Sequence, residues 1–285
     1  MNGVKGKTFV VTGATGRQGS AVVRHLIQAG AQVKALTRSP QSKKAKQIAA
    51  LGAELVAGDM ANPDLLKTLF QGASGVYSVQ NPYTSSFAAE VQQGKNVADA
   101  AKAAGVAHLV QGSAGLGGKT GIPSWDSKLE IQAYMQSLGL PLTVLRPTAF
   151  MELISDPAYY PMASTFHLMP KLMGPDKKVT WLAVDDLGAI AAKVFADPQK
   201  YIGQDLKLAS DLQTINEVRA LYQQVLGRKA PHFPMPVFMF RMFTGDDLII
   251  MWNYLRTAMI DVTTEATLAI LPEAQTVRTW LTRQK

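Results

Sequence analysis

The stretch Phe9-Val10-Val11-Thr12-Gly13-Ala14-Thr15-Gly16-Arg17-Gln18-Gly19 decides the fold class of this chain. It begins with a β-branched and aromatic run typical of a buried strand, and Gly13 ends that run. A helical pattern of apolar residues follows until Gly30. Residues 33–36 then have the composition of a second strand. Strand, glycine turn, helix and strand in this order predict a complete β-α-β unit within roughly thirty-five residues.

Apolar runs and helical patterns continue to alternate as far as residue 145. Asn62 and Pro63, for example, supply an N-cap and a first-turn proline for one predicted helix. Because each strand is followed by a crossover helix, we expect a Rossmann-type, doubly wound parallel sheet. The further strands are predicted at residues 54–56, 76–79, 109–110 and 142–145, and the further helices at residues 42–51, 62–70, 87–104 and 126–138.

The glycine turn has the form of a phosphate-binding loop. A tight turn, close approach of the backbone to a diphosphate and close helix packing each require glycine, and Gly13, Gly16 and Gly19 lie at a strand-to-helix junction. The amino end of the helix then faces the phosphates. Glycines occur in many turns, but this position favours a dinucleotide site that also includes Thr15 and Gln18.

Two arginines favour NADP(H) over NAD(H) as the dinucleotide. Arg38 ends the second strand nineteen residues after Gly19, where an NAD-binding fold would hold an acidic ribose ligand. A guanidinium there can bind the 2′-phosphate of NADP, and Arg17 in the turn can reach the same group, with Lys43 assisting. The alternative is that both arginines are ordinary surface cations.

Composition limits the other classes of site. The chain has no cysteine, so disulfides and thiol catalysis are excluded, and its four histidines are too scattered in sequence to predict a metal site. The formal charge of +8 is spread along the chain. Weak nonspecific contact with DNA stays open, but a ligand that carries several phosphates is the simpler explanation, and no specific nucleic-acid partner is expected.

No membrane or export segment is expected. The N-terminus runs through Lys5 and Lys7 directly into the first strand, without the apolar region of an export signal, which predicts a cytoplasmic location. Residues 235–255 are the most apolar stretch, but Arg241 and two aspartates interrupt them. They are therefore expected to pack on protein.

The glycine turn and Arg38, with Gly58-Asp59-Met60 and Leu145-Arg146-Pro147, give the chain a resemblance to the NmrA-like family of atypical short-chain dehydrogenases/reductases. The resemblance spans most of the chain and is strongest before residue 150. It implies a Rossmann-type fold and an NAD(P)(H) cofactor, while fold alone says little about substrate.

The resemblance also implies further cofactor contacts. It places Asp59 and Met60 beside the adenine, and Gln80 and Asn81 beside the ribose and nicotinamide, with Phe150 also in the cofactor site. The alternative for Asp59 is a turn residue next to a helix. For Gln80 and Asn81 the alternative is a polar loop that closes the fourth strand.

The catalytic pair of typical short-chain dehydrogenases is incomplete in this sequence. By the resemblance, Lys128 matches the lysine of a Tyr-x-x-x-Lys pair and Ser113 matches the serine, but Ser124 occupies the tyrosine position. A serine hydroxyl has too high a pKa to serve as the same acid. Lys128 could bind the nicotinamide ribose, or it could be a solvated helix lysine. Tyr134 would lie on another helix face, and Tyr83 is a possible but unsupported substitute.

After Pro147 the regular alternation ends, which predicts a Rossmann domain over residues 1–150 and a smaller, mostly helical substrate lobe over residues 151–285. Segments between about residues 176 and 210 are expected to return to the sheet. Helices are predicted at residues 184–196, 215–226 and 264–282, and a strand at residues 206–208. Nine of the twelve methionines lie between Met151 and Met259, where prolines at 157, 161, 170 and 175 are expected to break up long elements.

The methionines and phenylalanines of this half have two interpretations. They could line an apolar pocket over the nicotinamide, or they could fill an irregular core or cover a subunit interface. The set is Phe150, Met151, Met162, Phe166, Met169, Met173, Met235, Phe238, Met239 and Phe243.

Three functions follow from these features. The first is an NADPH-dependent reductase of quinone-like or other small apolar acceptors, in which position and desolvation matter more than a strong protein acid. The second is a noncatalytic NADP(H) redox sensor that acts through a protein partner. The third, an isomerase or lyase with an internal redox relay, would need the missing tyrosine and is the least favoured.

Overall fold

The structure, a computed structural model, describes residues 3–156 and 163–285. Two compact units are present. The first unit comprises Met1–Arg146 and Asp185–Leu206, and the second unit comprises Pro147–Val184 and Lys207–Lys285. The segment that returns to the first unit after residue 184 lies within the region that the sequence predicted to rejoin the sheet.

The first unit is built on a seven-stranded sheet in the order β3-β2-β1-β4-β5-β6-β9. Neighbouring strands from β3 to β6 pair in parallel, so the predicted doubly wound α/β fold is confirmed. Strands β2 and β3 are added on one side of β1, and β4 to β6 are added on the other side. Ligands of such folds bind where the strand order reverses in this way, here between β1 and β4. The strands are β1 (Thr8–Val11), β2 (Gln32–Thr37), β3 (Glu54–Ala57), β4 (Gly75–Ser78), β5 (Leu109–Gly112), β6 (Leu142–Pro147) and β9 (Asp205–Leu208).

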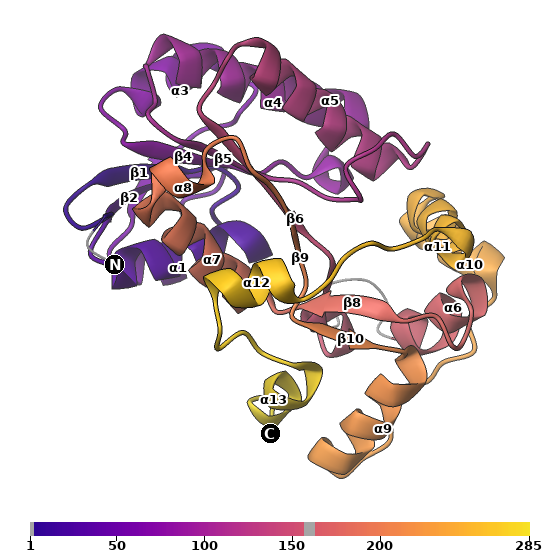
Figure 1. Ribbon diagram of the computed structural model, residues 1–285. Coiled ribbons are helices and arrows are strands. Elements are labelled where there is room, and N and C mark those ends of the chain that lie inside the picture. The colour runs from indigo at the N-terminus through magenta and orange to yellow at the C-terminus, as the bar shows by residue number, and fades with distance from the viewer. Residues whose placement is uncertain (1–2, 157–162) are drawn as a thin grey trace. The chain divides into compact units, whose positions relative to one another are not determined.

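Helices cover both faces of this sheet (Figure 1). On one face, α3, α4 and α5 bury a core that includes Val10, Leu66, Phe70 and Ile131. On the other face, α1 packs against α7. The helices of this part are α1 (Arg17–Gln28), α2 (Lys43–Ala50), α3 (Pro63–Phe70), α4 (Phe87–Ala103), α5 (Pro123–Ser137), α7 (Val184–Ala196) and α8 (Pro198–Tyr201), with a 3-10 turn η1 (Pro82–Thr84) before α4.

Helix α5 begins three residues earlier than the sequence predicted. Its first residue is Pro123, which needs no backbone N–H at that position. Asp126 lies in the first turn of the helix, and its carboxylate accepts the N–H groups of Thr120 and Gly121. The predicted start at Asp126 is therefore corrected to Pro123, and Asp126 holds the loop that precedes the helix.

The contact between α1 and α7 depends on Gly188 and Asp185. A Cβ atom on Gly188 would lie 2.6 Å from the backbone carbon of Ala21, so only glycine allows this approach. Asp185 accepts from Arg24 at 2.5 Å and from His25 at 2.7 Å. The bond from His25, above all, lowers the pKa of the Asp185 carboxyl below its usual range. Asp185, in the first turn of α7, thus joins two helices.

The second unit holds a three-stranded sheet in the order β10-β8-β7. Two predictions for this region were wrong. The helix expected over residues 264–282 is two short helices separated near Pro272, and α6 continues through Pro170. The elements are β7 (Ala149–Phe150), η2 (Met151–Ile154), α6 (Ala163–Met173), β8 (Val179–Leu182), β10 (Asp211–Gln213), α9 (Ile215–Leu226), α10 (Val237–Thr244), α11 (Asp247–Thr257), α12 (Glu265–Ile270) and α13 (Val277–Thr282).

Most of the described methionines and phenylalanines that could have lined a pocket pack inside the second unit. Trp181 and Trp252 are buried with them, and the Phe240 ring stacks on Trp252 with 5.4 Å between ring centroids. Phe238 and Phe243 remain exposed on α10. Met162 lies outside the described residues. The buried members of the set are Met151, Phe166, Met169, Met173 and Met235, with Met239 partly buried against them.

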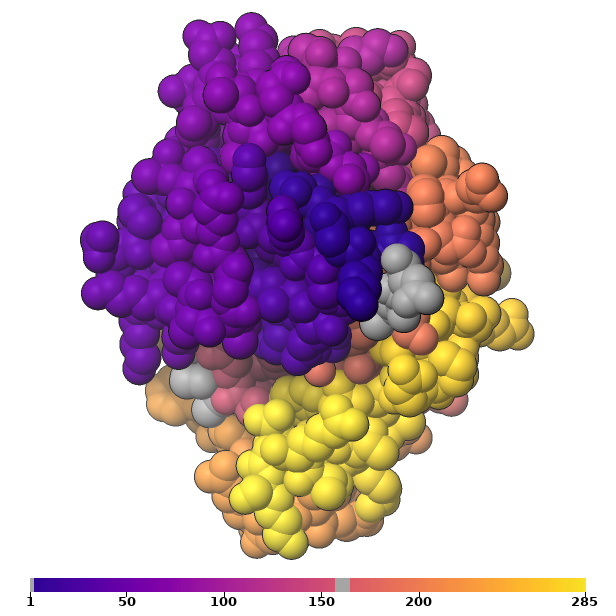
Figure 2. Space-filling model, turned by 90° about the vertical axis from the view of Figure 1, so that its left-hand side faces the viewer, coloured from indigo at the N-terminus to yellow at the C-terminus, as the bar shows by residue number. Residues whose placement is uncertain are grey.

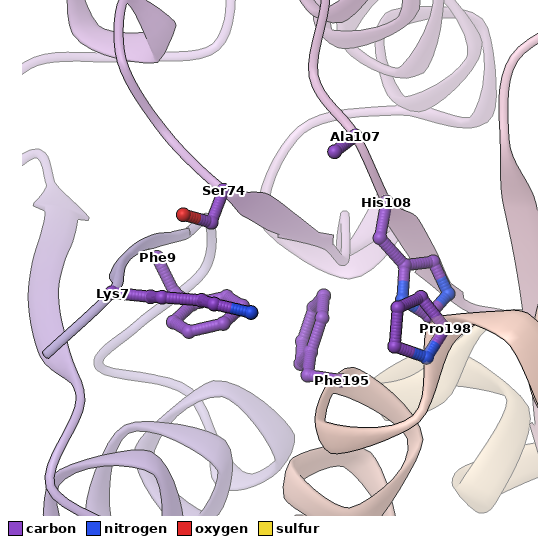
Figure 3. A pocket seen from close by; sticks show the side chains of 7 residues that line it. All are labelled: Lys7, Phe9, Ser74, Ala107, His108, Phe195 and Pro198. Carbon is purple, nitrogen blue, oxygen red and sulfur yellow. The ribbon is translucent and has the colours of Figure 1, made fainter. Parts of the chain in front are cut away.

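A shallow pocket of about 190 Å³ lies at the amino-terminal edge of the first unit's sheet (Figure 3). Its floor is a row of rings, with Phe195 4.9 Å from Phe9 and 5.3 Å from His108 between centroids. Lys7 extends its ammonium group toward this floor. In Figure 2 the segment after residue 185, in orange, lies beside the indigo N-terminal segment on the surface.

His108, in the floor of this pocket, is buried and neutral. Thr143 Oγ1 donates to the Tyr201 carbonyl, so its oxygen must accept from His108 Nε2–H at 2.8 Å. The other ring nitrogen, Nδ1, therefore carries a lone pair, and it has no hydrogen-bond partner among the described residues. Burial lowers the pKa of His108 from 6.5 to about 4.

This burial predicts a specific pH dependence of stability. Between pH 6.5 and 4 the unfolded chain binds a proton at His108 and the folded chain does not, so the free energy of unfolding should fall by about 3 kcal/mol as pH decreases through this range. Urea unfolding at several pH values measures the slope. The variant His108→Gln keeps an N–H donor for Thr143 and should lose that part of the slope. Equal slopes for the two proteins would contradict the assignment.

Candidate functional site

The turn between β1 and α1 closes so tightly that its glycines cannot be replaced without displacement of the backbone. Gly13 has a φ of +57°, and Gly16 donates its N–H to the Gly13 carbonyl at 2.8 Å. A Cβ atom on Gly19 would lie 2.3 Å from the same carbonyl oxygen. Helix α1 therefore begins directly over the end of β1. Gly16 is its N-cap, and the first turn has neither a capping side chain nor an acidic residue.

Such a helix end can bind an anion. Its first N–H groups have no intrahelical partner and its dipole is positive there. In α2, α3 and α4 the N-cap residues Ser42, Asn62 and Ser86 accept a backbone N–H with a side-chain oxygen. Helix α5 also lacks a capping side chain, but its N-cap is Ile122 and Pro123 begins the helix without an N–H donor. The open cap at Gly16 leaves its donors for a ligand.

Buried hydrogen bonds join the turn to β4. Thr12 Oγ1 contacts the backbone of Tyr77 and Val79, including the Val79 N–H at 3.0 Å. The Tyr77 hydroxyl donates to Gln18 Oε1 at 3.1 Å. Burial raises the pKa of Tyr77 well above its usual range, so this phenol remains a donor. The Gln18 side chain is thus held by Tyr77.

Arg38 and Asp59 lie next to each other after β2 and β3. Arg38 is exposed, and its Nε is 3.8 Å from Asp59 Oδ2. Asp59 Oδ1 accepts the N–H of Ala61 at 2.8 Å, which closes the turn after β3. The terminal nitrogens of the Arg38 guanidinium have no hydrogen-bond partner among the residues that the structure describes, so they are available to an anion. Arg17 is half-buried in the first turn of α1.

Met60, Gln80 and Asn81 follow β3 and β4. The Gln80 side chain is buried and donates to Ser78 Oγ at 2.9 Å and to Met60 Sδ at 3.6 Å. Asn81 is exposed, and its side chain accepts the Tyr83 N–H at 3.0 Å. The amide of Gln80 is therefore committed to the protein, whereas its backbone carbonyl accepts from Lys128.

Lys128 is buried, and so is not the solvated helix lysine that the sequence allowed. Its Nζ donates to Glu90 Oε1 at 2.6 Å and to the Gln80 carbonyl at 3.2 Å. Ser127 donates to the other carboxylate oxygen of Glu90 at 2.5 Å. Gln111 from β5 donates to the Lys128 carbonyl at 3.0 Å. These contacts fix the lysine at the carboxyl ends of β4 and β5.

Ser113 is held by a buried arginine. Arg146 donates to Ser113 Oγ at 3.2 Å and to the Ala114 carbonyl at 2.7 Å. It also donates to Gln132 and makes a two-pronged ion pair with Asp205. Ser113 is therefore sealed inside the first unit, 1% exposed.

Ser124 and Lys128 lie four residues apart in α5, on one helix face, so the serine occupies the place of the usual tyrosine. Tyr134 donates to Asp99 at the surface, which raises the pKa of its phenol. Tyr83 is exposed on η1. Among the described residues of α5, no tyrosine shares the face of Lys128.

Two features were missed from the sequence. Glu90 is an acidic residue in the first turn of α4, which by itself indicates only a favourable helix dipole. Arg146 was noted only as part of a motif. Nothing near Glu90 or Arg146 in the sequence indicates that these side chains are buried. Their partners are distant in sequence: Lys128 lies 38 residues from Glu90, and Asp205 lies 59 residues from Arg146.

The remaining predicted site residue, Phe150, lies in β7 of the second unit, so its contact with a cofactor stays a prediction. The fold also brings together two histidines that are far apart in sequence. His167 Nδ1 is 3.1 Å from His232 Nε2. Within the described ranges, no group of three or more potential ligands could hold a metal ion.

The family model described as the NmrA-like family matches residues 5–259. The chain belongs to this family. Among curated relatives of this NmrA-like chain, "NmrA-like family domain-containing oxidoreductase FrzB" from Cladobotryum sp is 33% identical over 258 residues, which cover 80% of this chain and 76% of that protein.

Solved structures share the NmrA-like fold. The negative transcriptional regulator NmrA in complex with NADP superposes with a TM-score of 0.80 at 22% identity, covering 98% of this chain and 95% of that one. The Escherichia coli NADPH-dependent quinone oxidoreductase QOR2 in complex with NADPH gives a TM-score of 0.74 at 20% identity, covering 97% and 99%. None of the helices in the described ranges has the length and apolar character that crossing a bilayer needs.

The glycine turn makes a testable prediction. Because the methyl group of Gly19→Ala would overlap the Gly13 carbonyl, the variant should lose about 1–3 kcal/mol of unfolding free energy, measured by urea denaturation. Gly118→Ala is the control, since its methyl group would meet open space. That variant should stay within about 0.5 kcal/mol of the wild type. A Gly19→Ala protein as stable as the control would show that the turn relaxes freely.

Proposed function

We propose that this chain is an NADP(H)-dependent reductase of quinone-like or other small apolar acceptors. The observation that carries the proposal is the open amino end of α1 beneath a turn with no room for a Cβ atom. Two nitrogens of Arg38 free for an anion support the choice of NADP(H). The family, and the complexes of NmrA with NADP or NAD and of QOR2 with NADPH, support a nicotinamide dinucleotide as the cofactor.

The residues of the first unit fit the cofactor. The glycine turn would take the diphosphate on backbone N–H groups, and Arg38 with Arg17 would take the 2′-phosphate. Asp59 and Met60 would face the adenine, and the segment at Gln80 and Asn81 would pass the nicotinamide side, as the family resemblance implies. Because the Gln80 amide is bonded within the protein, this segment would contribute its backbone.

Lys128 is the proposed direct contact to the nicotinamide ribose. An ammonium group has three N–H donors, and the described residues accept two of them. The third is free for a ribose hydroxyl. Ser113 is fully buried and bonded to Arg146, so we assign it a supporting role in place of direct contact with substrate.

The missing tyrosine restricts the chemistry. When bound, NADPH supplies a hydride, and one further proton completes the reduction of a quinone to a hydroquinone. The charge that develops on a quinone oxygen is delocalised, so the proton can come from water, and no protein phenol is required. A simple carbonyl would need that acid much more, which favours quinone-like acceptors.

A second function, that of a noncatalytic NADP(H) sensor, also follows from the missing tyrosine. Ser124 in the tyrosine position is compatible with a protein that binds cofactor without turnover. The structurally similar NmrA is named as a negative transcriptional regulator.

Purified protein should oxidise NADPH in the presence of a panel of quinones. Tight NADPH binding with no oxidation by any acceptor would favour the sensor.

Cofactor choice is tested through Arg38. Arg38→Ala should weaken NADPH binding roughly 10- to 100-fold, the loss expected for charge-assisted bonds to a phosphate, and leave NADH binding within about twofold. Isothermal titration calorimetry with both nucleotides measures the difference. Lys46→Ala, an exposed cation of α2, is the control and should bind both nucleotides as the wild type does. An equal loss for NADPH and NADH would exclude selective recognition of the 2′-phosphate by Arg38.

A further inference from the structure

Glu90 is a completely buried carboxylate that forms an ion pair with Lys128. Its side chain is 0% exposed, at the amino end of α4. Oε1 accepts from Lys128 and Oε2 accepts from Ser127, so both oxygens are held by adjacent residues of α5. A buried carboxylate without such partners would be strongly destabilising. The two charges are therefore kept together.

The position of the Lys128 ammonium follows from this pair. A lysine has four rotatable side-chain bonds and no fixed donor direction. Here Glu90 from α4 and the Gln80 carbonyl after β4 bind two N–H groups, and Gln111 from β5 holds the lysine's own backbone. With two donors fixed, the direction of the third is also fixed.

We propose that Glu90 is a positioning residue of the cofactor site, which directs the free N–H of Lys128 toward the nicotinamide ribose. This inference rests on the proposed contact of Lys128 with NADP(H). Lys128 is thus assigned the binding of the ribose, and Glu90 acts on the cofactor only through Lys128.

The neighbouring pair Lys95–Glu130 provides a matched comparison. It also joins α4 to α5, with 2.8 Å between Lys95 Nζ and Glu130 Oε1. It lies at the surface, where ion pairs contribute little. If Glu90 only held the two helices together, its effects would be on stability alone and would not depend on which part of the cofactor is offered.

The experiment compares NADPH with adenosine 2′,5′-bisphosphate, which lacks the whole nicotinamide mononucleotide half, by calorimetry on the full chain. Glu90→Gln should weaken NADPH binding roughly tenfold or more, because the ammonium loses its fixed direction and charge partner. Binding of the bisphosphate should stay within about twofold, because it does not reach Lys128. Glu130→Gln should bind both ligands as the wild type does.

A double-mutant cycle separates positioning from other causes. In a Lys128→Met background, the change Glu90→Gln should have no further effect on NADPH affinity, since Glu90 acts only through the lysine. Glu90→Asp, which keeps the charge, should recover part of the affinity that Glu90→Gln loses. Additive losses in the double variant would overturn the proposal.

The stability of each variant is measured independently of its ligand binding. Each variant is first checked by thermal unfolding, and if Glu90→Gln does not fold, Ser127→Ala tests the same carboxylate with both charges in place. This variant frees one oxygen of Glu90 and should weaken NADPH binding but not bisphosphate binding. Equal weakening of both ligands, or of neither, would overturn the inference. Failure of the wild type to bind either ligand would instead reject the proposed function.

Discussion

The close approach of Gly19 to the carbonyl of Gly13 is the constraint on which the first unit depends. It allows α1 to begin directly over the end of β1, with a glycine N-cap that provides no capping side chain. Thr12 and Tyr77 then fix the same turn to β4, the neighbouring strand at which the chain order reverses. A dinucleotide site at this edge is thus a consequence of backbone packing and requires few specific side chains.

Charge is distributed unevenly around that edge. On the β2 side, Arg38 is exposed and only partly offset by Asp59, which suits reversible binding of a solvated phosphate. On the α5 side, Lys128 is buried and its charge is matched by Glu90. An exposed guanidinium selects a ligand through its own charge, whereas a buried ion pair contributes mainly geometry, because desolvation cancels much of its attraction.

The second unit shows why the methionine-rich half was hard to interpret. Its apolar residues do not follow one period, since helices and short strands share a single irregular core around Trp181 and Trp252. Methionine adapts to such a core as well as to a ligand, so its presence does not distinguish the two. The helix expected over residues 264–282 is broken at a point that the sequence does mark. Pro272 lies between the two short helices, and a proline interrupts the backbone hydrogen bonds of a helix.

The sequence alone determined the parallel sheet, the glycine turn and the position of Arg38 at the end of the second strand. Each is a local pattern set by strand and helix periods and by glycine at a strand-to-helix junction. Only the tertiary structure decided that Lys128 is buried against Glu90 and that Ser113 is sealed by Arg146. These contacts join segments separated by more than thirty residues. Their existence depends on helix packing and desolvation, which no local pattern specifies.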